Sequence, residues 1–453
     1  MNKKNLGKIN VLMEGVWLLI FFLVPLFFTN LLNSVWQISK LSLSLFFIEV
    51  LLFLWIFKTL FLKEKIFKKD QIKFICPGFI FIFILGLAVL FSDFQQYGFW
   101  GYYFRQMGYL AYLHFFLFFL VLFFNLKTKK QVQRIFYAIL ASLFLVVFYG
   151  ILQILGVDPI NWSEPAFLTQ RIFSTLGQPN FLGSWLLLTG PIFIWLSWYY
   201  FSPKKTNQSF PSTTPLLIVP LIVCFFFFTL LALILTQSRG AWIGFLFSGL
   251  FLLIILIGPT RKKLLFKILF LFLILSGTIF FLFNSSSFLN KEDQSIFLTR
   301  IKSLTQLKET GGLRIILWQQ SLDLIREKPF LGYGLESQHF VFAPVYQPEQ
   351  ATLESINLMP DRAHNDFLDT LLVSGILGGL AYLFLIISSF YLGLKYVLKS
   401  KFSEEKLMGL VLLTGLLGYL ISLQFSFAVI TTTLYFWAYL AIILKIIYGL
   451  EDK

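Results

Sequence analysis

Residues 215–257 decide the fold, and they read PLLIVPLIVCFFFFTLLALILTQSRGAWIGFLFSGLFLLIILI. Two apolar runs, 215–236 and 241–257, are joined by the short turn Thr236-Gln237-Ser238-Arg239-Gly240. About 20 apolar residues in a helix cross the roughly 30 Å hydrocarbon layer of a membrane. A transmembrane β-barrel would show alternating polar and apolar residues instead of unbroken runs. The stretch therefore predicts two membrane-spanning helices with a tight turn between them.

The composition of the whole chain extends this prediction to all 453 residues. Hydrophobic residues make up 58%, aromatic residues 19% and charged residues only 13%. So few polar residues cannot cover the surface of an ordinary soluble domain. No internal repeat and no second soluble domain are evident. We predict an all-α integral membrane protein in which residues 1–453 form a single polytopic membrane domain.

Apolar runs of spanning length recur along the chain and predict about twelve transmembrane helices. The amino-terminal run follows Lys3, Lys4 and Lys8 like a signal peptide, but no small-x-small cleavage site follows Phe28. We therefore interpret it as an uncleaved first span. The predicted spans are 11–29, 41–62, 74–91, 107–125, 132–155, 180–201, 215–236, 241–257, 264–283, 367–394, 407–424 and 428–448.

Connections rich in lysine and arginine alternate along the chain with connections poor in them, and this pattern predicts the orientation of the protein in the membrane. Segments 58–73 and 125–134 are rich in them, whereas 30–40, 92–106 and 156–179 each hold one. Cytoplasmic loops of membrane proteins carry the excess of positive charge. We therefore expect a multi-pass protein of the cytoplasmic (inner) membrane, with both termini in the cytoplasm and the longest polar region, 284–366, outside.

The net charge of +15 has the same explanation, because the basic residues flank the spans and can meet anionic lipid headgroups. Membrane lipids, and not nucleic acid, are the partners that this charge predicts. The two cysteines, Cys76 and Cys224, lie at or in predicted spans and indicate no disulfide framework.

The outer loop 284–366 is expected to be structured. Apolar residues at helical spacing predict an amphipathic helix at 313–327 that ends before Pro329 and lies on the membrane or on the bundle. Residues 329–334 have the composition of a turn, and 343–362 are expected to form an irregular lid. The apolar face of the predicted helix comprises Leu313, Ile316, Leu317, Trp318, Leu322 and Ile325.

Three arginines on the outer side are candidate anion ligands: Arg239, Arg314 and Arg171. Arg239 lies in the tight turn at membrane depth, where an arginine is costly unless it is paired or reaches the interface. Arg314 lies in the first turn of the predicted amphipathic helix, where the helix dipole disfavours a cation unless an anion is bound. A guanidinium binds phosphate with a planar fork of donors. The alternatives are an interfacial arginine at 239 and solvated charges at 314 and 171.

His364 is the candidate catalytic residue, at the entrance of the predicted span 367–394. Histidine can take a proton from a hydroxyl near neutral pH. Asn365, Asp366 and Asp369 are possible supports that could orient it, and the alternative is a helix cap or surface residue. We expect no metal, because no acidic pair on the outer side has the spacing of a cation site. No Gly-rich phosphate loop is present, so the energy must come from an activated lipid-linked substrate.

Several motifs in order resemble the O-antigen ligase and O-antigen polymerase superfamily of bacterial lipid-linked glycan transferases. They are Leu176-Gly177-Gln178-Pro179-Asn180 after Arg171, Thr236 to Trp242, Arg314 with Trp318, Pro329-x-x-Gly332-x-Gly334, and His364-Asn365-x-x-Leu368-x-x-Leu371-x-x-x-Gly375-x-x-Gly378. The resemblance covers about residues 165–395. Val373 stands where relatives often have a glutamate, which leaves Asp366 and Asp369 as substitutes by proximity only.

The resemblance implies a GT-C-like fold and a metal-independent, inverting glycosyltransferase that needs no cofactor. Its donor would be an undecaprenyl-diphosphate-linked glycan, and its acceptor a hydroxyl on lipid A-core or another surface glycan. By the same resemblance Arg239 and Arg314 hold the diphosphate, and His364 is the base. A polymerase of the same superfamily, or a lipid-linked saccharide transporter (flippase), are the alternatives.

Overall fold

The structure is a computed structural model that describes residues 3–29, 31, 32, 34–62, 69–160, 171–201, 214–257, 312–353 and 359–451. These residues form helices and loops, and among them the structure has no β-strand beyond one isolated bridge between Thr128 and Glu451. The predicted all-helical fold is confirmed for this part of the chain.

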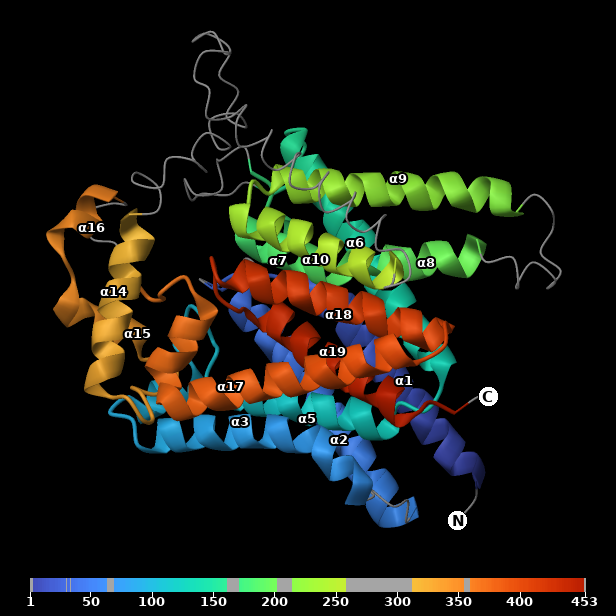
Figure 1. Cartoon of the computed structure of the whole chain (residues 1–453), viewed down its shortest axis with the longest axis horizontal. Helices are drawn as coiled ribbons and strands as arrows, with labels where there is room; N and C mark the ends of the chain where they lie inside the picture. Colours follow the sequence, from blue (N-terminus) through green and yellow to red (C-terminus); the bar gives the residue numbers. More distant parts are fainter. Residues whose placement is uncertain are drawn as a thin grey trace, which may run out of the picture.

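Sixteen α-helices and three short 3-10 helices are described, with the numbering of Figure 1. The α-helices are α1 Lys3–Leu26, α2 Gln37–Leu62, α3 Ile72–Leu90, α4 Gln95–Trp100, α5 Tyr109–Asn125, α6 Lys129–Ile154, α7 Pro179–Thr189, α8 Ile192–Phe201, α9 Thr214–Leu235, α10 Arg239–Ile257, α14 Gly312–Glu327, α15 Gln338–Phe342, α16 Pro348–Leu353, α17 Asp366–Lys399, α18 Glu404–Leu423 and α19 Ile430–Tyr448. The 3-10 helices are η1 Lys69–Gln71, η3 Ser174–Leu176 and η6 Ala343–Val345.

Within the described residues, 9 helical segments are long and apolar enough to cross a membrane. α5 and the apolar part of α9, Pro220–Leu235, are shorter. The chain is therefore a multi-pass membrane protein. Every predicted span coincides with helix except 264–283, which lies outside the described residues, so the count of twelve stays a prediction. The span predicted at 180–201 is divided into α7 and α8 at Gly190-Pro191, because proline cannot donate a backbone hydrogen bond inside a helix.

The long helices lie side by side, and α19 is at the centre of the bundle (Figure 1). Every residue of α19 from Ile430 to Lys445 is buried. α10 and α18 approach closely because glycines face each other: a Cβ added to Gly244 would lie 2.4 Å from the carbonyl oxygen of Gly418. In Figure 1 the short helices α14, α15 and α16 gather at the left end of the bundle, and the chain termini lie toward the opposite end.

α14 stands across the ends of the long helices (Figure 1). Its buried face contains Leu317, Ser321 and Leu324, and the two leucines belong to one buried cluster with Ala363 and Leu372. Leu322 was predicted to share this face but is 45% exposed. At 100° per residue it lies about 140° around the helix from Leu317.

The segment predicted as an irregular lid, 343–362, contains η6 and α16, and residues 354–358 of it lie outside the described residues.

α17 is not the continuous helix that the sequence predicts, because its backbone breaks at Gly375 (φ 65°, ψ −170°). The predicted turn 329–334 fills the break with hydrogen bonds. The backbone N–H groups of Tyr333 and Gly334 donate to the carbonyls of Leu372 (3.0 Å) and Val373 (2.9 Å). The N–H of Ile376 donates to the carbonyl of Pro329 at 2.7 Å. Backbone groups that a broken helix frees inside a membrane protein need such partners.

The two halves of α17 fold toward each other at this break. The hydroxyl of Tyr382 donates to Asp366 Oδ2 at 2.8 Å, although sixteen residues would separate them by about 24 Å in a straight helix. The first half of α17 is thus a short helix at the same end of the bundle as α14, and it begins two residues after His364.

Candidate active site

A polar cavity of about 230 Å³ is lined by the four residues that the sequence singles out most strongly. They are Arg171, Arg239, Arg314 and His364. They come from four separate segments of the chain, which only the fold brings together. The full lining is Arg171, Asn180, Ser184, Gln237, Ser238, Arg239, Gly240, Leu313, Arg314, His364, Ser422, Phe425 and Ser426. We call this cavity the arginine pocket.

Helix starts surround the arginine pocket. α7 contributes Asn180 from its first turn, α10 begins with Arg239, and α14 contributes Arg314 from its first turn. His364 lies two residues before the first residue of α17. Each helix start carries a partial positive charge and backbone N–H groups without helical partners. Together with three guanidinium groups, this arrangement makes the pocket a site for an anion.

The turn between α9 and α10 holds Arg239 at the pocket wall. Gln237 has a left-handed backbone (φ 49°), a conformation that costs energy for a residue other than glycine. Trp242 Nε1 donates to the carbonyl of Leu233 at 3.1 Å and so ties α10 back to α9. A Cβ on Gly240 would lie 3.1 Å from the carbonyl oxygen of Ser422, so only a small residue lets the turn approach α18.

Arg171 has a structural role at the pocket wall as well as a positive charge. Its Nε donates to the carbonyl of Thr236 at 3.0 Å, and its Nη2 donates to Asn180 Oδ1 at 3.4 Å. Arg171 therefore links the segment before α7 to the turn that carries Arg239.

Arg314 is half-buried, and none of the ion pairs within the described parts of the chain includes it. Burial lowers the pKa of its guanidinium, which stays protonated because its ordinary value is so high. A partly buried cation without a carboxylate partner is costly unless an anion binds beside it. Arg314 is the pocket residue whose environment points most directly to an anionic ligand.

His364 has a left-handed backbone (φ 54°), and its ring lies 5.4 Å from the ring of Phe427. Burial, together with the positive charges of Arg314, Arg105 and Arg362, lowers its pKa to about 4 against an opposing effect of Asp361. The imidazole is therefore neutral near neutral pH, which is the form that can accept a proton.

The predicted supports Asn365, Asp366 and Asp369 do not line the arginine pocket. Asn365 caps α17, because its Oδ1 accepts from the N–H groups of Phe367 and Leu368, both at 3.1 Å. Asp366 accepts from Tyr382, and Asp369 Oδ1 accepts from the N–H of Ala363 at 2.9 Å. Their contacts hold the backbone around His364 and do not reach its ring.

One side of the pocket was not predicted from the sequence: Ser422 from the last turn of α18, and Phe425 and Ser426 from the connection between α18 and α19. These residues carry no charge and belong to no motif that we recognised, so the sequence offered no signal for them. Asn180 and Ser238 were part of recognised motifs, but their side chains were not singled out.

These features define a class: a multi-pass membrane protein, helical throughout the described residues, with an arginine-lined polar pocket. Comparison with known proteins gives the family. Residues 224–383 match the O-antigen ligase family, the superfamily that the sequence motifs resemble. The matched part includes Arg239, Arg314 and His364, but not Arg171.

The chain is also similar to a ComP-specific O-oligosaccharyltransferase of Acinetobacter baylyi. The two are 29% identical over 227 residues, which is 48% of this chain and 34% of the relative. The similarity therefore spans about a third of the relative's length.

Proposed function

We propose that this protein is a membrane glycosyltransferase that moves a glycan from undecaprenyl diphosphate to a hydroxyl acceptor on the outer face of the cytoplasmic membrane. The observation that carries the proposal is the arginine pocket, which places His364 beside three arginines where helices begin. A transferase of this kind needs an anion site for the leaving group and a base for the acceptor, and the pocket offers both.

The arginines would bind the donor diphosphate. Arg314 and Arg239 supply donors and positive charge for the oxygen that becomes negative as the glycosidic bond to phosphate breaks. These groups offer, without a metal ion, the charge stabilisation that a divalent cation provides to other diphosphate enzymes. The reaction would accordingly be metal-independent.

A second cavity, of about 390 Å³, is almost entirely apolar and shares three helices with the arginine pocket. α7, α10 and α18 contribute to both. Its lining residue Ser248 lies nine positions after Arg239 on α10, about 14 Å further along the helix. The hydrocarbon chain of a lipid-linked donor would pack against the apolar residues of this second cavity while its diphosphate is bound in the arginine pocket.

His364 would act as the general base. Its neutral imidazole takes the proton from the acceptor hydroxyl as that oxygen attacks the anomeric carbon, and the bond to the diphosphate breaks on the opposite side. A single displacement of this kind inverts the anomeric configuration. The diphosphate leaves with the electron pair of the broken bond.

Proteins that catalyse this class of reaction differ in the acceptor that receives the glycan. Lipid A-core would make the protein a ligase, a growing glycan would make it a polymerase, and a protein hydroxyl is the acceptor that the name of the Acinetobacter relative suggests. A saccharide transporter is the alternative from another class, but transporters bind substrate near the membrane midplane on broken helices. Here the charged pocket lies where helices begin, close to the surface helix α14.

The test is transfer by the purified protein in lipid bilayers, with an undecaprenyl-diphosphate-linked glycan and each of the three acceptor classes. We expect a new glycosidic bond to one acceptor, in the presence of EDTA, and release of undecaprenyl diphosphate. Arg314→Gln should abolish transfer, whereas Arg326→Gln, an exposed position on the same helix, should not. Movement of the glycan across the bilayer without any new bond would show a transporter instead.

A further inference from the structure

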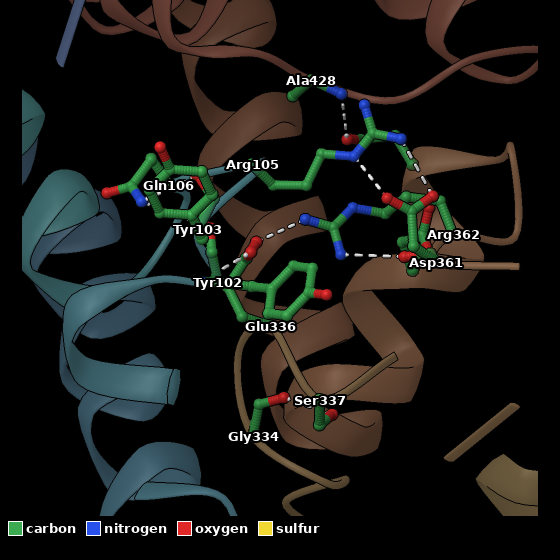
Figure 2. Close-up of polar contacts among 12 residues, drawn as sticks. Tyr102, Tyr103, Arg105, Gln106, Gly334, Glu336, Ser337, Asp361, Arg362 and Ala428 are labelled. Carbon is green, nitrogen blue, oxygen red and sulfur yellow. Dashed lines mark hydrogen bonds and ion pairs between the residues drawn. The ribbon is translucent and has the colours of Figure 1, made fainter. Parts of the chain in front are cut away.

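A network of four charged side chains lies next to the arginine pocket, on the far side of the His364 backbone. Arg105 forms an ion pair with Asp361, with Nη2 donating to Oδ1 at 2.9 Å. Arg362 forms a second ion pair with Glu336, and both side chains of this pair are buried. Figure 2 shows the two pairs side by side.

The network joins three distant parts of the chain. Arg105 and Tyr102 belong to the segment 101–108, which connects α4 to α5. The backbone N–H of Tyr102 donates to Glu336 Oε2 at 3.1 Å, so this segment is tied to both ion pairs (Figure 2). Asp361 and Arg362 directly precede Ala363 and His364.

The backbone of Ala363, between the ion pairs and His364, is also fixed in both directions. Its N–H donates to Asp369 Oδ1 at 2.9 Å, and its carbonyl accepts from Trp318 Nε1 at 3.0 Å. Left-handed backbone at a residue other than glycine persists only where the surroundings over-determine it. His364 (φ 54°), Glu336 (φ 58°) and Gln106 (φ 60°) are three such residues in and around the network.

Phe427 connects Arg105 to the histidine ring itself. The guanidinium carbon of Arg105 lies 4.5 Å from the centre of the Phe427 ring, which is within the range of a cation–π contact. The same ring lies 5.4 Å from the ring of His364. Arg105 therefore contacts Phe427, whose ring lies beside the His364 ring, and Asp361, which interacts electrostatically with His364.

We propose that Arg105 is a positioning residue for His364: through its ion pair with Asp361 and its contact with Phe427 it fixes the imidazole at the pocket wall. The role in catalysis rests on the proposed function, whereas the effect on the imidazole does not. Arg105 lies outside residues 224–383, so the family match does not assign it.

Charged groups face His364 from every side, and Arg105 is one of several. Arg314 approaches from α14, Arg105 from the segment 101–108, and Asp361 and Arg362 from its own segment. Arg171 and Arg239 share the pocket, and Glu336, Asp366 and Asp369 lie beyond the backbone. Removing one positive charge from this set should raise the pKa of His364.

The test measures the His364 titration directly, because the chain has only 3 histidines. His114→Gln and His339→Phe leave His364 as the single histidine, and phenylalanine keeps the ring contact that His339 makes with Tyr102. NMR of labelled histidine in the full chain in nanodiscs then gives the pKa. We expect Arg105→Gln to raise it by roughly 1 unit, and Arg105→Lys to raise it less, since lysine keeps the charge but not the fork.

Kinetics in the same background separate positioning from general stability. Arg105→Gln should lower kcat by roughly 10- to 100-fold, the range expected from a misplaced catalytic group, with little change in affinity for undecaprenyl diphosphate. The control Arg326→Gln removes an exposed ion pair with Asp323 on α14 and should change neither quantity.

The double variant Arg105→Asp with Asp361→Arg rebuilds the ion pair in reverse, and it keeps the test valid if Arg105→Gln does not fold. It should recover at least part of the kcat that Asp361→Arg loses alone. An unchanged His364 titration in Arg105→Gln would overturn the proposal. If Arg105→Gln shifts the His364 titration but the protein with Arg105 intact transfers no glycan, the proposed function is refuted. The positioning role of Arg105 then still holds.

Discussion

The depressed pKa of His364 has two opposing effects on its role as a base. Burial and neighbouring arginines lower its pKa to about 4, so near neutral pH it is available as a base but binds a proton weakly. A bound diphosphate would offset the charge of Arg314 and its neighbours and make the imidazole more basic. Base strength and donor binding are therefore coupled through the same arginines.

This coupling predicts two different pH profiles. Because the pKa of His364 is depressed, its active neutral form persists as pH falls and is lost only near pH 4. We expect kcat/KM, which reports the free enzyme, to hold down to about pH 5 and to fall toward pH 4. The acid limb of kcat, which reports the donor complex, should lie at higher pH. Coincident limbs near the ordinary histidine pKa of about 6.5 would contradict the account.

The Arg362–Glu336 ion pair predicts a large effect on stability. Both side chains are buried, so Glu336→Gln leaves a buried guanidinium without its partner. Breaking such a pair costs about 3–5 kcal/mol. The exposed Arg326–Asp323 pair is the control, and Asp323→Asn should cost about 0–1 kcal/mol. Unfolding of the two variants in matched detergent measures the difference, and equal stabilities would show that the buried pair is not needed.

At the residue level, the sequence identified the members of the pocket better than their supports. Arg239, Arg314 and His364 stood out because each was a polar group in an unusual position, and the fold brings them together with Arg171. Arg105 appeared in the sequence only as a charge in an outer connection. Its partner Asp361 is 256 positions away, and no local pattern predicts such a pair.

Among the elements, α17 shows the limit of periodicity most clearly. Its apolar run predicts one uninterrupted span, yet Gly375 breaks it and the segment 329–334 supplies the missing hydrogen bonds. The glycines at 332, 334 and 375 were recognised as a motif, and the residues 329–334 as a turn. The sequence did not predict that this turn inserts into a helix. The two segments are joined by backbone hydrogen bonds, and every residue has backbone groups, so no side-chain pattern marks the contact.

The break predicts that Gly375→Ala destabilises the protein strongly. A Cβ there would lie 2.2 Å from the backbone of Phe330, and φ of 65° is strained for alanine. We expect a loss of more than about 3 kcal/mol and of transfer activity, since the first half of α17 follows His364 directly. Gly409→Ala in α18 is the matched control, because nothing lies within 4 Å of its Cβ. It should be neutral or slightly stabilising in thermal unfolding.

For the whole molecule, the distribution of basic residues predicts the orientation. α14, which contributes Arg314 to the arginine pocket, lies toward one end of the bundle, and the termini lie toward the other (Figure 1). Composition alone was enough for the membrane class and the helical fold. The packing order, with α19 buried at the centre, was not predictable, since every span is apolar.

The orientation predicts opposite labelling of two exposed phenylalanines, Phe104 (54% exposed) beside α4 and Phe402 (58% exposed) between α17 and α18. In a background with Cys76 and Cys224 replaced by alanine, Phe104→Cys should react with a membrane-impermeant thiol reagent in intact cells. Phe402→Cys should react only after the membrane is opened. The reverse pattern would place the pocket in the cytoplasm.

The central claim is that His364 is the base of a glycan transfer in the arginine pocket, and a single-turnover experiment tests it most directly. Donor is bound first to the purified protein or to His364→Gln, and transfer to the acceptor is then timed. We predict that His364→Gln binds undecaprenyl-diphosphate-linked glycan as the unsubstituted protein does, but transfers it at least about 100-fold more slowly. Transfer at an undiminished rate by His364→Gln would contradict the account.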